Sequence, residues 1–137
     1  MIKSNLILTL ALTLVVSSSL FAQSEIEQIE KTVNYYLKGG TNGDREMVTK
    51  AFHEKATLQF VRDGEHVLIP IADFLARIKD KQERKTRIVY INHEGDAAQA
   101  KVKIEYETFD LIDYFNLLKV NGEWKIISKI FIREDKT

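Results

Sequence analysis

The spacing of apolar residues predicts that the first part of the chain is helical. Apolar positions recur three or four residues apart from about residue 24 to residue 38, and Gly39-Gly40 is expected to end this helix. Asp44 is a suitable N-cap for a second, short helix that runs through Phe52. A third helix is expected over residues 71–79, because a proline directly before it suits a helix start.

Short apolar runs and strict alternation predict strands in the rest of the chain. A hairpin is expected over residues 57–69, with its turn at Asp63-Gly64. A strand over residues 87–92 precedes an alternating stretch, residues 98–106, in which one face is buried and the other is wet. Because the helices come first and the long antiparallel strands last, we expect an α+β fold with helices on one face of a curved sheet.

The last two strands are expected to form a long hairpin around Asn121-Gly122, a dipeptide that suits a two-residue type I′ turn. This turn pairs Val120 with Glu123 and, in a regular ladder, places Asp113 opposite Ile130. The face assigned to the helices then carries Asp113, Phe115, Leu117, Trp124, Ile126, Ser128 and Ile130. The opposite face carries Ile112, Tyr114, Asn116, Leu118, Lys125, Ile127, Lys129 and Phe131.

This register places the carboxylate of Asp113 among apolar side chains, with Lys129 on the other face of the sheet. A buried carboxylate needs partners or a raised pKa. Two other interpretations of Asp113 stay open. It lies near a sheet edge and is exposed to solvent, or it makes a hydrogen bond with a purely structural role.

The N-terminal segment has the pattern of a secretory signal peptide. Lys3 precedes an apolar run of eleven residues, 6–16, and small residues follow up to Ala22. About 20 residues are needed to span a bilayer, so the run is short for a membrane helix. We therefore predict a signal peptide over residues 1–22, cleavage after Ala22, and a secreted or periplasmic domain over residues 23–137. An uncleaved anchor or a buried N-terminal helix is the alternative.

Composition narrows the function classes. The 137 residues suit one domain, and 45% of them are hydrophobic. Without Lys3 the 20 basic residues become 19, against 20 acidic residues, and this balance favours neither nucleic acid nor an anionic membrane as a partner. The sequence has no cysteine, and its three histidines lack metal-ligand spacing, so no metal or cofactor is indicated.

Three stretches together resemble the nuclear transport factor 2-like superfamily, and within it small bacterial proteins labelled putative lumazine-binding. They are AFHEKAT (residues 51–57), GDAA (residues 95–98) and DYFNLLKV-NG-EWKI (residues 113–126). The resemblance implies a cone in which a strongly curved, mainly antiparallel sheet wraps three N-terminal helices, often with a pocket at its open end and often as a dimer. Members include isomerases, dehydratases and transport factors, so the fold does not select a function.

Ketosteroid isomerases of this superfamily offer a comparison of single residues. They form an oxyanion hole from a tyrosine and a protonated aspartic acid, and a second aspartate acts as the base. By resemblance, Tyr36 and Asp113 match the oxyanion pair, whereas Phe60 stands at the position of the base and cannot take a proton. Asp63 could substitute as a base, although a turn position suits it better.

We therefore predict a domain that binds a small, partly apolar molecule in a cavity with one polar end. The predicted ligand-binding residues are Tyr36, Phe60, Phe74, Asp113, Phe115 and Trp124. One alternative is a lyase or isomerase that uses Asp113 and Tyr36. The other is a structural module or homodimer that associates through the outer sheet face, at Ile112, Leu118, Ile127 and Phe131.

Overall fold

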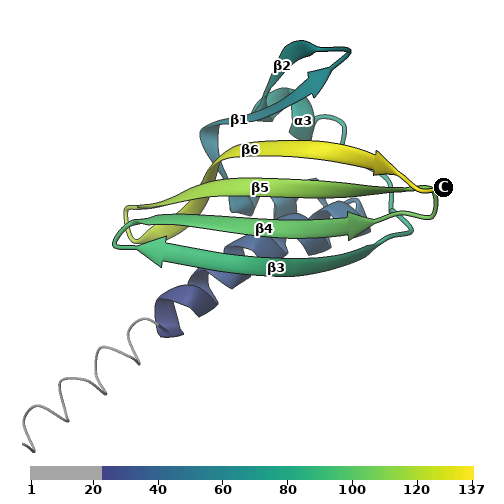
Figure 1. The fold of residues 1–137 in the computed structure, drawn as a ribbon. Helices are drawn as coiled ribbons and strands as arrows, with labels where there is room; N and C mark the ends of the chain where they lie inside the picture. The colour runs from purple at the N-terminus through teal and green to yellow at the C-terminus, as the bar shows by residue number, and fades with distance from the viewer. Residues whose placement is uncertain (1–22) are drawn as a thin grey trace, which may run out of the picture.

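The computed structural model describes residues 23–137 and contains helices packed against one curved, six-stranded sheet (Figure 1). The predicted signal peptide, residues 1–22, lies outside the described residues. Within the described range, no helix is both long enough and apolar enough to cross a membrane. The predicted α+β architecture, with a mainly antiparallel sheet that curves around helices, is confirmed.

The first helix covers residues 23–42 of the described chain, so it continues through Gly39-Gly40 and the predicted helix end is wrong. The helix ends instead at Gly43, whose φ of 69° suits glycine. Gly39 serves close packing, because a Cβ atom there would lie 2.7 Å from Cγ2 of Val48. Helix α2 (Arg45–Ala51) starts as predicted, with the Asp44 side chain accepting a hydrogen bond from the backbone N–H of Met47.

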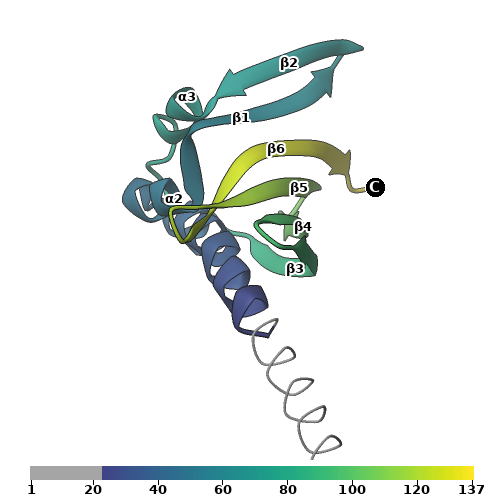
Figure 2. The same ribbon diagram turned by 90° about the vertical axis from the view of Figure 1, so that its left-hand side faces the viewer.

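The strands are β1 (Phe52–Arg62), β2 (Glu65–Pro70), β3 (Lys85–Glu94), β4 (Ala97–Glu105), β5 (Phe109–Val120) and β6 (Glu123–Asp135). Helix α3 (Ile71–Leu75) follows β2 and is shorter than predicted. The spatial order of the strands is β2-β1-β6-β5-β4-β3, and only the β1–β6 pair is parallel. Figure 2 shows β6 bending strongly and the β1–β2 hairpin rising away from it as an arm.

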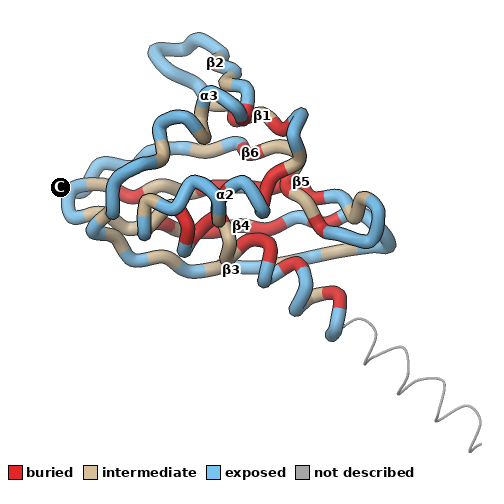
Figure 3. Tube along the Cα trace, turned by 180° about the vertical axis from the view of Figure 1, so that it is seen from behind, coloured by how far each residue is buried: buried red, intermediate tan, exposed pale blue. Residues whose placement is uncertain are grey.

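The core lies between the helices and the inner face of the sheet, where buried segments of the first helix face those of the central strands (Figure 3). Strand β1 is paired with β6 only as far as Gln59 and Ile130. Beyond this point β1 stays paired with β2 alone, and the two arms of the sheet separate. This separation opens the region next to the core in which the cavities described below lie.

A β-bulge in β6 changes the predicted register of the last hairpin. The pairs Val120–Glu123 and Leu117–Ile126 form as predicted, but the next pair is Asn116–Ser128, so Ile127 is an extra residue. A one-residue shift exchanges the two faces of a strand. The prediction is therefore wrong beyond Ile126.

The shift reverses the positions of four side chains. Lys129 and Phe131 lie on the inner face, opposite Phe115 and Asp113 respectively, whereas Ser128 and Ile130 are on the outer face. The prediction that Lys129 faces away from Asp113 is corrected, as is the prediction that Phe131 belongs to the outer face.

Candidate functional site

Three ionisable side chains from three elements meet inside the sheet, and we call them the cavity cluster. Tyr36 comes from the first helix, Asp113 from β5 and Lys129 from β6. The Tyr36 hydroxyl donates to Oδ2 of Asp113 at 2.6 Å. The Lys129 ammonium donates to the same Oδ2 at 3.1 Å and to the Tyr36 oxygen at 2.8 Å. A tyrosine, a carboxylate and an amine thus form a closed triangle of hydrogen bonds.

The bulge explains why this triangle exists. Asp113 lies on the inner face in either register. Lys129 joins it there, although not directly opposite, because Ile127 is left out of the ladder. Tyr36 occupies the helix face that packs on these strands, and its ring contacts Phe115 edge-on with a centroid distance of 5.2 Å. Asp113 is 0% exposed, and the exposed fractions of both Tyr36 and Lys129 are 3%. The cluster is therefore shielded from bulk water.

Burial controls the ionisation of the cluster. It lowers the pKa of the Lys129 ammonium below its ordinary value, although the charge and hydrogen bond of Asp113 oppose this change. Burial also raises the pKa of Tyr36 well above its ordinary value, and the adjacent Asp113 carboxylate adds to that increase. The phenol thus stays protonated, whereas the amine loses its proton more easily than an exposed lysine.

Two further observations describe the surroundings of the cluster. The Lys129 Nζ lies over the faces of three aromatic rings, at 4.5 Å from the centroid of Phe131, 5.0 Å from that of Tyr36 and 5.3 Å from that of Phe74. The second carboxylate oxygen of Asp113, Oδ1, is buried and has no hydrogen-bond partner among residues 23–137. An unpaired buried acceptor costs about 1–3 kcal/mol, so this cluster is not optimised for stability.

The cluster borders a cavity of about 320 Å³, which we call the inner cavity. Tyr36 and Lys129 contribute to its wall. Its apolar lining consists of Leu58, Phe60, Ile69, Phe74, Ile78, Leu111 and Phe131. Exposed Arg62, Arg77, Lys79 and Asp80 also line it and mark its opening to solvent. The volume is at the small end of the ~300–1,000 Å³ range of ligand pockets.

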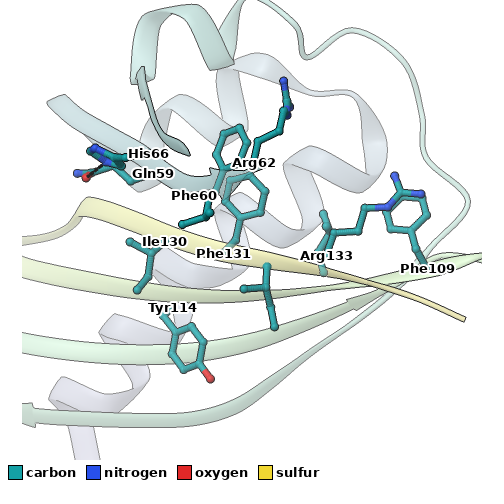
Figure 4. A pocket seen from close by; sticks show the side chains of 12 residues that line it. Gln59, Phe60, Arg62, His66, Phe109, Tyr114, Ile130, Phe131 and Arg133 are labelled. Carbon is teal, nitrogen blue, oxygen red and sulfur yellow. Dashed lines mark hydrogen bonds between the residues drawn. The ribbon is translucent and has the colours of Figure 1, made fainter. Parts of the chain in front are cut away.

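A second, more open hollow of about 850 Å³ lies between the β1–β2 arm and the end of β6 (Figure 4). Its wall towards the inner cavity contains the rings of Phe60 and Phe131, whose centroids are 4.7 Å apart. Figure 4 shows these two rings next to each other, with Gln59 and His66 nearby. The side chains of Gln59 and His66 share a hydrogen bond of 2.9 Å. None of its lining residues is a buried ionisable group. We therefore assign the candidate site to the inner cavity.

The six predicted ligand-binding residues fall into three groups. Tyr36, Phe60 and Phe74 line the inner cavity. Asp113 and Phe115 do not line it but support Tyr36, the first by a hydrogen bond and the second by ring packing. Trp124 lies elsewhere, since its indole N–H donates to Glu25 at 2.8 Å. Three of the six predicted residues thus line one cavity, and ligand binding by them stays a prediction.

Glu25 and its partners form a separate group that we call the end cluster. One Glu25 oxygen accepts from the Trp124 indole, and the other accepts from the Lys119 ammonium at 2.7 Å. The hydrogen bond from Lys119 is the main reason that the pKa of Glu25 is below its ordinary value. This cluster fastens the start of the described chain to the turn end of the β5–β6 hairpin.

Lys129 is the functional candidate that sequence reasoning missed. A signal for it exists: Ile126-Ile127 places two apolar residues in succession, and the alternation that resumes at Lys129 is out of phase with that before Ile126. Such a change of phase is typical of a β-bulge. No group of three or more metal-ligating side chains is found among the residues that the structure describes.

Comparison with known proteins places the chain in context. The family model described as Putative lumazine-binding matches residues 24–132. An NTF2-like protein of unknown function from Shewanella baltica OS155 is 30% identical and superposes with a TM-score of 0.76, over 82% of this chain and 96% of that one. Another from Methylobacillus flagellatus KT is 28% identical, with a TM-score of 0.73 and coverage of 81% and 93%.

A curated relative extends this picture to an enzyme. Aldolase FrzH from Cladobotryum sp. is 26% identical over 114 residues, which cover 79% of this chain and 90% of that protein.

Proposed function

This chain belongs to the Putative lumazine-binding family of nuclear transport factor 2-like proteins, and on that premise we propose that it binds a small, partly apolar molecule in the inner cavity. The observation that carries the proposal is the position of the buried cavity cluster in the wall of a hollow that combines apolar side chains with a charged opening. A concave apolar site with a few convergent polar groups is typical of ligand-binding sites.

The lining suggests the chemistry of the ligand. The rings of Phe60, Phe74 and Phe131 suit an apolar, preferably aromatic, body. Lys129 lines the cavity and offers a donor for a ligand oxygen, whereas the Tyr36 hydroxyl proton already points to Asp113. A carbonyl or phenolate oxygen suits this donor. The ligand class proposed is therefore a one- or two-ring molecule with one such oxygen.

An NMR titration with benzaldehyde and acetophenone tests this proposal. We expect saturable shifts of backbone amide signals around Tyr36, Phe74 and Lys129, and none around Gly122, in the turn that joins β5 to β6. The variant Phe74→Ala should weaken the response, whereas the control Leu68→Ala should keep it. A spectrum that stays unchanged around the inner cavity at high concentration of both probes would contradict the proposal.

A lyase or isomerase that uses the cavity cluster is the second candidate. It is supported by the 2.6 Å hydrogen bond between Tyr36 and Asp113, and the name of the Cladobotryum relative, an aldolase, points in the same direction. In this candidate Asp113 moves a proton while the Tyr36 phenol stays protonated. Turnover that is lost in Asp113→Asn but kept in Phe115→Leu would support it, because only the first change removes the proton acceptor.

We further propose that the protein is secreted or periplasmic, on the strength of the signal-peptide pattern in residues 1–22. Mass spectrometry of the protein recovered from expressing cells tests this. A chain that starts at Gln23 outside the cytoplasm supports the proposal, whereas an intact Met1 in the cytoplasmic fraction opposes it.

The outer sheet face supports a proposal of homodimerisation. It exposes Tyr114, Leu118, Ile130 and Ile132, and the exposed fractions of the two isoleucines are 52% each. Apolar patches of this kind often mark interfaces between copies. Light scattering should show a dimer that Ile130→Glu dissociates, whereas Leu68→Glu on the β1–β2 arm should leave it intact. A monomeric wild-type protein would contradict this proposal.

A further inference from the structure

Lys129 is the one buried lysine among residues 23–137. Lysine side chains are rarely buried completely, because removing an ammonium from water is costly. A pair with Asp113 offsets part of this cost, but the pair leaves Oδ1 of Asp113 without a hydrogen bond. A purely structural ion pair is expected to satisfy its carboxylate more fully. The position of this lysine therefore calls for a chemical explanation.

The geometry leaves the amine available to a ligand. An ammonium has three donor positions, and Lys129 uses two of them, for Asp113 and Tyr36. Its Nζ lies among the faces of Phe74 and Phe131, and the same side chain lines the inner cavity. The third N–H position of Lys129 thus faces aromatic rings and is not used by a protein acceptor among the described residues.

The electrostatic surroundings favour the neutral amine more than at an exposed lysine. Burial is the largest effect, and the positive charge of Arg84 adds to it, while Asp113 acts in the opposite direction. Arg84 is held in place by Thr41 and Tyr106, at 2.9 Å each. A desolvated lysine with a nearby cation is a recognised way to activate an amine as a nucleophile.

We propose that Lys129 is a nucleophile that forms a reversible imine with an aldehyde or ketone held in the inner cavity. This inference rests on the ligand-binding function proposed above and specifies its ligand class as carbonyl compounds. The apolar rings would hold the body of the carbonyl compound, and the cavity cluster would supply and accept the protons of the reaction.

The reaction is balanced with the groups present. The Lys129 ammonium gives one proton to the Asp113 carboxylate, and the amine lone pair attacks the carbonyl carbon. A C–N bond forms, and the carbonyl π electrons move to oxygen, which takes the proton back from Asp113. A second proton leaves nitrogen through Asp113 to this hydroxyl, which departs as water while the nitrogen lone pair forms the C=N bond. The products are one protonated imine and one water, and no oxidant or reductant is needed.

Tyr36 has a positioning role in this scheme. Its hydroxyl stays protonated and donates to Oδ2 of Asp113, while its oxygen accepts from Lys129. These two bonds fix the amine and the carboxylate relative to each other. A Tyr36→Phe variant should therefore slow imine formation without changing which lysine reacts.

Reductive trapping with benzaldehyde tests the inference on the full chain. The protein is incubated with benzaldehyde near neutral pH, sodium cyanoborohydride is added, and the modified lysines are identified by peptide mass spectrometry. We expect a mass increase of one benzyl group, located at Lys129 and saturable with benzaldehyde. Each unit by which a pKa is lowered gives about tenfold more neutral amine, so Lys129 should react faster than exposed lysines such as Lys38.

Two variants sharpen the test. Lys129→Arg keeps the positive charge but has no nucleophilic amine, so it should lose the fast benzyl adduct. Lys125→Arg changes a lysine of the same strand that binds the Lys50 carbonyl on the outside, and it should label like the wild type. If Lys129→Arg does not fold, the map of modified lysines in the wild-type protein decides alone.

The outcomes separate this inference from the proposed function. If benzaldehyde shifts the NMR signals around the inner cavity but labels only exposed lysines, the imine is ruled out and ligand binding stands. If neither benzaldehyde nor acetophenone shifts those signals and benzaldehyde does not label Lys129, both proposals fail. Fast, saturable modification confined to Lys129 supports both.

Discussion

The end cluster and the cavity cluster both join the first helix to the β5–β6 hairpin, but they differ in how completely their carboxylate is bonded. In the end cluster, each oxygen of Glu25 has its own donor, from Lys119 and Trp124. In the cavity cluster, Oδ2 of Asp113 accepts both hydrogen bonds and Oδ1 accepts none. Tyr36 and Lys129 of the cavity cluster also line the inner cavity.

This difference indicates which cluster is structural. A polar network in which every group is satisfied stabilises and orients the elements that it joins. A network that leaves a buried acceptor unpaired and a lysine desolvated costs stability, and such groups concentrate at functional sites. The comparison therefore indicates a structural role for Glu25 and a role in the proposed ligand chemistry for Lys129. Variants in both clusters can test these two roles.

The largest expected effect is that of Lys129→Met. It leaves the buried Asp113 carboxylate without its cation, and breaking a buried pair in this way costs about 3–5 kcal/mol of unfolding free energy. The double variant Lys129→Met/Asp113→Asn should recover more than half of this loss, because the amide is neutral and still accepts from Tyr36. Urea unfolding of the two single variants, the double variant and the wild type measures the coupling.

The control for this experiment is Lys125→Met, on the outer side of the same strand. Its side chain is 25% exposed, so the change in unfolding free energy should stay within about 0.5 kcal/mol. Additive effects of Lys129→Met and Asp113→Asn would show that the two groups are not coupled, and the distinction between the clusters would then fail.

A smaller effect is expected from Tyr36→Phe. The variant keeps the ring packing on Phe115 but removes one hydrogen bond to Asp113 and one acceptor for Lys129. Leaving such buried groups less satisfied costs about 1–3 kcal/mol. Urea unfolding should show this loss, whereas the neighbouring Tyr35→Phe, on a half-buried side chain, should change the unfolding free energy by less than about 0.5 kcal/mol.

Equal losses in the variants of Tyr36 and Tyr35 would mean that the hydroxyl of Tyr36 has no special role.

Local patterns predicted the fold because each element follows from short-range chemistry. The Asn121-Gly122 turn, with φ values of 50° and 79°, set the hairpin register from Val120–Glu123 to Leu117–Ile126. The family resemblance also predicted that Tyr36 and Asp113 lie together, since their pairing depends on the same order of elements. These parts required no knowledge of distant packing.

The remaining part of the site depends on irregularities that propensities do not specify. One extra residue, Ile127, brings Lys129 inward, and a strand-period argument that assumes a regular ladder must place it outside. The inner cavity also depends on where β1 separates from β6, beyond Gln59, which is a property of the whole sheet. The predicted helix end at Gly39-Gly40 was wrong for a related reason, because the packing of Gly39 against Val48 requires a small residue within the helix.

The smallest effect concerns the pH dependence of the end cluster. The pKa of Glu25 is lowered below 4.5 in the folded protein, mainly by the Lys119 hydrogen bond, so the unfolded chain binds a proton more readily than the folded one. Its contribution is therefore fully present above about pH 4.5 and is lost as the pH falls through the lowered folded pKa. The variant Glu25→Gln removes this contribution at every pH.

The difference in unfolding free energy between the wild type and Glu25→Gln should thus be largest near neutral pH and shrink on acidification, as measured by urea unfolding from neutral to acidic pH. Glu123→Gln is the matched control, because Glu123 is exposed and lies 3.8 Å from Lys125. A Glu25→Gln difference that stays constant with pH would show that Lys119 does not stabilise the ionised carboxylate. The end cluster would then stabilise the fold through the hydrogen bond from Trp124 and not through the charge of Lys119. The number of hydrogen bonds to each carboxylate oxygen would then no longer distinguish the two clusters.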